Sequence, residues 1–154
     1  MRHRPIRCGW LIALLLTHGA LGAEPKSAAL LTRLVHQAVT GGQAAVISPH
    51  LSVLLGISSS EGVTPVRQMD LQSGDVHRLF DVCDSNHDRI VLMAVDANKH
   101  VSAYLMSPGG VLRKAIVYDI GGETHEQSLA EAKPGFMRLR EFWLGQARDL
   151  KAPH

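Results

Sequence analysis

Four apolar stretches joined by short, turn-forming connections constrain the fold of this chain more than any other feature. The stretches span residues 76–83, 89–95, 100–107 and 111–118, and the connections between them are rich in Asp, Asn, Gly and Pro. Short connections of this composition join antiparallel neighbours, because these residue types form tight turns. The sequence therefore predicts an antiparallel meander of four strands over residues 76–118.

The second stretch of the meander is apolar on both of its faces. Every residue from 90 to 95 is apolar, which is typical of a central strand that is covered on both sides. In the last stretch, alternation places Leu112 and Ile116 on one side and Ala115 on the other. Upstream, residues 66–71 form a further predicted strand that leads into a hairpin turn.

The segments outside the meander have helical or mixed patterns. Residues 27–40 place leucines at helical spacing and are followed by two glycines, so they predict a helix. Residues 44–47 predict a strand that leads into an irregular piece. Residues 123–132 and 136–150 predict two helices, because Pro134 lies between them. We therefore expect an α+β fold, with a central antiparallel sheet of about five strands and an N-terminal helix and C-terminal helices packed on it.

The N-terminal residues have the order of a secretory signal peptide. Three arginines within residues 1–7 precede an apolar run at 11–16, and small residues at 20–23 offer a cleavage site. The apolar run is too short to span a bilayer comfortably, although an uncleaved anchor is the alternative. We therefore expect residues 1–23 to be removed as a signal peptide. Residues 24–154 are then expected to form a single periplasmic domain without a membrane span.

Charge and cysteine content narrow the possible partners. Without the leader, 13 Lys and Arg face 14 Asp and Glu, so there is no basic field for nucleic acid. Cys8 is expected to leave with the leader, which makes Cys83 the lone cysteine of the mature chain and excludes a disulfide scaffold. As a strand-end residue, Cys83 is expected either to be buried or to be available for an intermolecular bridge.

A short polar loop that holds a histidine separates the first two predicted strands of the meander. A core needs no such composition. The loop is therefore either a simple turn, in which Asp and Asn hydrogen-bond the backbone, or the functional end of the domain. The candidate partner-binding site consists of the loop and its flanking residues, namely Cys83, Asp84, Ser85, Asn86, His87, Asp88 and Arg89.

The sequence holds none of the common catalytic signatures. It has no glycine-rich phosphate loop, no G-x-S-x-G elbow and no H-E-x-x-H. Cys83 and His87 are a conceivable nucleophile pair, but four residues apart across a turn they lack an orienting group. We therefore expect that the protein is not an enzyme and needs no cofactor.

The sequence contains two sets of possible metal ligands, and both are incomplete. Asp84, Asn86 and Asp88 have the spacing of a calcium loop. However, Arg89 stands where that loop needs glycine, and Val95 stands where it needs glutamate. Weak calcium binding is kept as an alternative. A zinc site would have to use residues scattered over strand ends, namely His77, Cys83, His87 and His100.

Several short motifs follow one another in a distinctive order. Thr64-Pro65 precedes the strand that ends in Phe80-Asp81-Val82-Cys83, and the loop then holds His87-Asp88 before an apolar strand that begins Arg89-Ile90. In this order the chain resembles the bacterial periplasmic inhibitors of vertebrate lysozyme, the Ivy family. The signal peptide, the leading helix and the chain length also fit this family of Gram-negative bacteria. The resemblance covers about residues 63–105.

The loop departs from the family pattern. The family's loop reads Cys-Lys-Pro-His-Asp-Cys and is closed by a disulfide. Here Asp84-Ser85 replace Lys-Pro, Asn86 is inserted, and Arg89 follows directly where the family has its second cysteine. The loop therefore lacks the internal clasp that reduces the ordering cost of binding.

The resemblance implies an exported inhibitor that protects peptidoglycan. Its partner would be a c-type lysozyme, or an endogenous muramidase or lytic transglycosylase. His87 would enter the enzyme's cleft and meet its two carboxyl groups, with Asp88 as a neighbouring hydrogen-bond acceptor. Asp84 would favour encounter with a cationic enzyme. The resemblance also permits a homodimer. A non-inhibitory periplasmic accessory or binding domain is the alternative.

Overall fold

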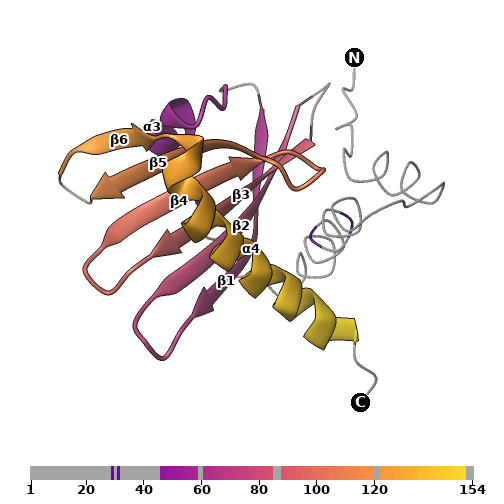
Figure 1. The fold of residues 1–154 in the computed structure, drawn as a ribbon. Coiled ribbons are helices and arrows are strands. Elements are labelled where there is room, and N and C mark those ends of the chain that lie inside the picture. Colours follow the sequence, from indigo (N-terminus) through magenta and orange to yellow (C-terminus); the bar gives the residue numbers. More distant parts are fainter. Residues whose placement is uncertain are drawn as a thin grey trace.

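An antiparallel sheet with helices on both faces makes up the described part of the protein (Figure 1). The computed structural model describes residues 29, 31, 46–58, 61–84, 88–119 and 122–151. Within these residues, six strands follow one another in the order of the sequence, β1-β2-β3-β4-β5-β6. The elements are α3 (Pro49–Leu54), β1 (Gly62–Asp70), β2 (Val76–Cys83), β3 (Asp88–Val95), β4 (His100–Met106), β5 (Leu112–Asp119), β6 (Thr124–Gln127) and α4 (Leu129–Lys151).

The predicted meander is confirmed, and the sheet has one strand more than expected. The four strands predicted between residues 76 and 118 match β2 to β5 to within one residue at each end. β1 begins before the predicted strand and includes Pro65, which an edge strand tolerates. Residues 124–127 were predicted as the start of a helix but form the short strand β6. Its four residues are polar and give no strand pattern, and Lys114 of β5 and Glu126 of β6 lie 3.8 Å apart as a cross-strand pair.

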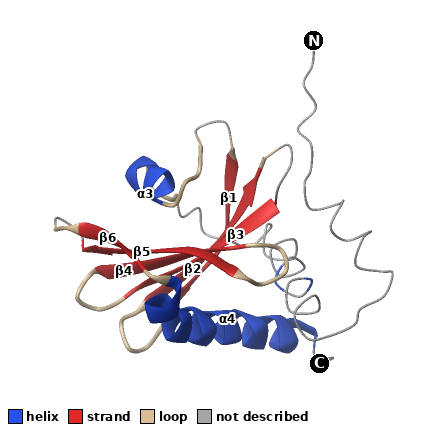
Figure 2. Cartoon of the chain, turned by 45° about the horizontal axis from the view of Figure 1, so that its top comes forward, coloured by secondary structure: helices blue, strands red, loops and turns tan. Residues whose placement is uncertain are grey.

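Both faces of the sheet are covered, as the apolar composition of residues 90–95 predicted. Figure 2 shows α4 along one face and α3 at the other. Alternate residues of β3 enter the two layers: Leu92 packs in the α4-side cluster and Val91 in the α3-side cluster. Trp143 of α4 and Leu55, which follows α3, are fully buried in these respective clusters. The sheet is therefore the central layer of the domain.

One helix stands where two were expected at the C-terminal end. α4 runs through Pro134 without interruption. The residues on either side of the proline, Ala132 and Phe136, are both buried against the sheet, so packing outweighs the lost backbone hydrogen bond. Ser128 and Glu131 form a capping box at its start, each side chain accepting from the other's backbone N–H at 3.2 Å. Among the described residues, no helix is long and apolar enough to cross a bilayer.

The strand predicted over residues 44–47 is wrong where the structure describes it, and so is the irregular piece expected after it. Val46 and Ile47 are not in a strand, and the irregular piece expected next contains the helix α3. Pro49 occupies its first turn, where a missing N–H costs little, and the Ser48 side chain accepts from the Leu51 N–H at 3.2 Å. Most of the expected helix 27–40 lies outside the described residues.

A bulge in β5 explains a second error. The register passes from Leu105↔Lys114 to Met106↔Leu112, so Arg113 has no partner. Leu112 consequently packs with the α4-side cluster, whereas Ile116 lies in the α3-side cluster. Strict alternation had placed Leu112 and Ile116 on the same side.

The contact between α4 and β4 predicts an unusual response to a helix-favouring substitution. A Cβ at Gly135 would collide with the hydroxyl of Tyr104, a buried ring, whereas its Cζ would lie at an ordinary 3.4 Å. Gly135→Ala should therefore lower the free energy of unfolding by about 1 kcal/mol or more, although alanine is usually favoured in a helix. In a Tyr104→Phe background the same substitution should be neutral or stabilising. Urea unfolding of the four proteins tests this, and a stabilised Gly135→Ala single variant would contradict it.

Candidate functional site

The predicted binding loop lies at the end of the β2–β3 hairpin. The two strands pair without a break from Val76↔Val95 to Cys83↔Asp88. Residues 84–87 therefore connect the strands directly at the end of the sheet. Of the seven candidate residues the structure describes four, which are Cys83, Asp84, Asp88 and Arg89; Ser85, Asn86 and His87 lie outside the described residues.

The hairpin end is bordered by the start of β1. In the register of these strands, Gly62 is opposite Cys83, Thr64 is opposite Asp81, and Pro65 is opposite Phe80. Thr64-Pro65 and the end of β2 are thus direct neighbours in the sheet. The structure therefore places the two motifs on neighbouring strands, and β1 borders the predicted loop on the β2 side.

An ion pair ties the base of the hairpin to the segment before β1. Arg89 Nη2 donates to Glu61 Oε1, and the other carboxylate oxygen of Glu61 accepts from the Ser58 N–H at 2.9 Å. The side chains of Arg89 and Glu61 are only 19% and 9% exposed. Asp84 Oδ2 lies 4.0 Å from the same Arg89 nitrogen. Solvent therefore screens this pair less than it would a surface pair, and the contact fixes the first residues of β3.

Sequence reasoning missed Glu61. It lies in a polar connection 28 residues before its partner Arg89, and no motif or spacing marks it. The only signal in the sequence was indirect: an arginine at the start of an apolar strand needs an anionic neighbour when it is partly buried.

Asp88 has an electrostatically strained position at the base of the loop. Burial, together with the nearby carboxylates of Asp81 and Asp84, raises the pKa of its carboxyl to about 6. Its Oδ1 atom is buried and has no hydrogen-bond partner among the described residues. Near pH 6 this group therefore exists in both forms, and it can accept a hydrogen bond as a carboxylate or donate one as an acid.

The described members of the zinc set considered from the sequence, His77, Cys83 and His100, do not form a metal site. In the described part of the chain, no three His, Cys, Asp or Glu residues are grouped to hold a metal. His77 packs edge-on against Phe142 with ring centroids 4.4 Å apart, and burial lowers its pKa. His100 instead has its Nδ1 3.5 Å from Asp119. The calcium-loop alternative stays a prediction because Asn86 is not described.

Cys83 is not free in the full chain, a form that the prediction of a lone cysteine in the mature chain did not address. It is disulfide-bonded in the structure of the full chain. The expectation of a lone cysteine depended on removal of Cys8 with the leader, and Cys8 itself lies outside the described residues. The two statements therefore refer to different forms of the protein.

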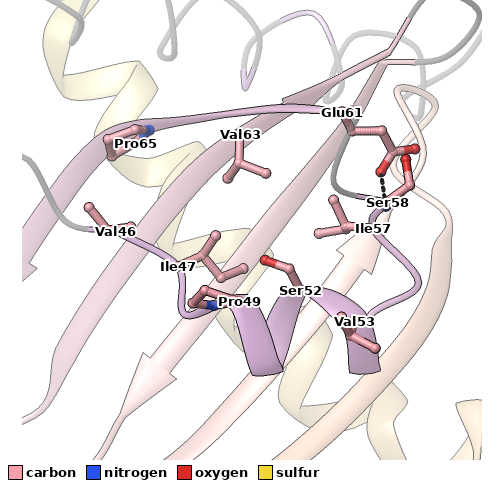
Figure 3. Close-up of a pocket in the computed structure, with 10 residues that line it drawn as sticks. All are labelled: Val46, Ile47, Pro49, Ser52, Val53, Ile57, Ser58, Glu61, Val63 and Pro65. Atoms are coloured by element: carbon pink, nitrogen blue, oxygen red, sulfur yellow. Dashed lines mark hydrogen bonds between the residues drawn. The ribbon is translucent and has the colours of Figure 1, made fainter.

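An apolar groove adjoins the hairpin end on the α3 side. This α3 groove has a volume of about 300 Å³ and lies between α3 and β1, with Val46 and Val53 among its exposed lining residues. Figure 3 shows the side chains of Ile57 and Val63 directed into it. Glu61 also lines it, so the groove reaches the ion pair that holds the hairpin base.

The raised pKa of Asp88 predicts how its removal changes stability with pH. The folded-state pKa lies above the ordinary value, so ionisation at neutral pH costs folding free energy and protonation relieves that cost as the pH falls through 6. Asp88→Asn should raise the free energy of unfolding at pH 7 by on the order of 1 kcal/mol after solvent screening, and by little at pH 4. Urea unfolding at both pH values checks this, with the exposed Asp70→Asn as control. A less stable Asp88→Asn variant at pH 7 would contradict the argument.

Comparison with known proteins identifies no relative. No family model matches the sequence, and no curated protein or solved structure is significantly similar to it.

Proposed function

We propose that the protein is an exported inhibitor of a c-type lysozyme or a related peptidoglycan-cleaving muramidase, and that it acts through the end of the β2–β3 hairpin. One observation carries the proposal. The motifs that resemble the lysozyme inhibitors lie on three adjacent strands, with Thr64-Pro65 opposite Asp81 and Phe80, and with Cys83 opposite Asp88. The strand ends that flank the connection, Cys83 and Asp88, lie at one end of the sheet, which is where a loop that enters a cleft would start.

The proposed mechanism is obstruction of the enzyme's catalytic carboxyl groups. A muramidase of this type works with one protonated and one ionised carboxyl. The imidazole of His87 enters between them, donates to the ionised group, and changes its own charge near neutral pH to suit its partners. Asp88 accepts a hydrogen bond beside it at neutral pH, where its carboxyl is ionised.

The contacts at the hairpin base support this mechanism. A loop that is already ordered loses less conformational entropy when it binds. The family's loop has an internal disulfide for this purpose, and here the residues at positions 84–89 cannot form one within the loop. The ion pair of Arg89 with Glu61, anchored on the Ser58 N–H, orders the base of the loop from outside instead.

A lysis assay tests the proposal. The mature chain, residues 24–154, should slow the clearing of a peptidoglycan suspension by hen-type lysozyme at near-stoichiometric amounts. His87→Ala should weaken inhibition roughly 30-fold or more, because a central interface residue typically contributes 2 kcal/mol or more. The matched control is His125→Ala, which removes an exposed histidine from β6 and should leave inhibition unchanged.

Two outcomes would contradict the proposal. The first is a folded wild-type chain that does not inhibit at a tenfold molar excess. The second is inhibition that His87→Ala and His125→Ala weaken equally, which would place the contact elsewhere on the protein.

A further inference from the structure

The two most exposed large apolar side chains of the described residues lie at the same groove. Val46 is 77% exposed and Val53 is 73% exposed, and both line the α3 groove. Single exposed apolar residues are common on protein surfaces, whereas exposed apolar groups gathered at a hollow are typical of a binding surface. The groove therefore presents an apolar surface that is open to another molecule.

The α3 groove adjoins the residues at which the predicted loop begins. Figure 3 shows Glu61 at one end of the groove and Val46 at the other. Glu61 pairs with Arg89 at the base of the hairpin. The next residue, Gly62, lies opposite Cys83, the last residue of β2, and neighbouring strands are about 5 Å apart. A protein that contacts the hairpin end therefore reaches the near end of the groove as well.

The predicted loop is too small to form a stable interface by itself. An interface of ordinary size buries about 800 Å² on each partner and uses about 20 residues or more. The candidate loop and its flanking positions, 83–89, supply seven residues. The contact surface of an inhibitor that acts at near-stoichiometric amounts must therefore extend onto surface beside the loop. A partner side chain that fills a pocket is typical of the residues that dominate binding energy.

The charge of the hairpin end favours a cationic partner. Four carboxyl groups and one guanidinium are described there, on Glu61, Asp81, Asp84, Asp88 and Arg89. None of the described residues that line the groove is basic. The excess of negative charge attracts a cationic enzyme through its long-range field, which requires no new ion pair with side chains that already have partners.

We propose that the α3 groove is a second contact surface for the muramidase that the hairpin end inhibits, and that it receives one apolar side chain from the rim of that enzyme's cleft. The side chain lies between Val46 and Val53, while the connection 84–87 enters the cleft. The volume of the groove, about 300 Å³, is at the lower limit of small-molecule pockets and suits a side chain better than a larger ligand. This inference rests on the proposed inhibition and adds the surface that enlarges its interface.

Affinity for the enzyme tests the proposal. The dissociation constant of the mature chain, residues 24–154, with hen-type lysozyme is measured by isothermal titration calorimetry. Val53→Asn and Val46→Asn should each weaken binding about fivefold or more, because each removes apolar surface that the complex buries. Val53→Ile keeps the apolar surface and should bind as tightly as the wild type.

A hollow beside α4 provides the matched control. Val111 is 49% exposed and lines this hollow of about 270 Å³, which lies between the β4–β5 turn and α4. Val111→Asn should leave the affinity for lysozyme unchanged. The three asparagine variants should unfold in urea at nearly the wild-type midpoint, because each replaces an exposed side chain.

The possible failures are distinguishable. A wild-type chain that does not bind lysozyme would overturn both the proposed inhibition and the groove contact. If the wild type binds and His87→Ala weakens binding, but neither Val53→Asn nor Val46→Asn does, the inhibition stands and the groove contact is overturned.

Two further results would assign the groove to another occupant and so overturn the proposal. A urea midpoint of Val53→Asn well below that of Val111→Asn would mean that part of the same chain fills the groove. Self-association of the wild-type chain that Val53→Asn abolishes, measured by sedimentation, would mean that a second copy fills it.

Discussion

Burial of β3 on both faces is the constraint on which the rest of the structure depends. A strand with Val91 toward one layer and Leu92 toward the other is stable only if each side of the sheet is covered. α4 and α3 provide these covers, and Trp143 and Leu55 fill the space against the sheet. With both faces occupied, the ends and edges of the sheet and the grooves beside the helices are the parts of the described residues that are open to another molecule.

At one end of the sheet, the sequence departs from what stability alone would select. Asp88 holds a buried carboxyl oxygen near Asp81 and Asp84, and Arg89 and Glu61 form a largely buried ion pair. A buried charge pair offers little net stability compared with apolar residues of similar size. Such local conflicts are expected where a protein binds rather than where it only packs. The buried charges therefore lie at the same hairpin end as the residues that resemble an inhibitory loop.

The sequence was most informative where side-chain pattern and turn chemistry agreed. Strands β2 to β5 were predictable because apolar runs alternate with turn residues, and the two-sided burial of β3 followed from its composition alone. The errors arose where tertiary contacts decide: Pro134 is accommodated within α4, β6 pairs through polar residues, and a bulge at Arg113 changes the facing of Leu112. The candidate loop was chosen from the sequence and stays a prediction, whereas the ion pair of Arg89 with Glu61 was not foreseen, since only the fold brings these residues together.

Hydrogen exchange is the most direct measurement of the central claim, that the end of the β2–β3 hairpin is the face that meets the partner enzyme. Exchange of the mature chain is followed by mass spectrometry with and without an equimolar hen-type lysozyme. The account predicts slower exchange in the peptide that spans residues 84–88, with the turn at 96–99, on the opposite end of the sheet, unchanged. Unaltered exchange at 84–88, or protection confined to the opposite end, would contradict it.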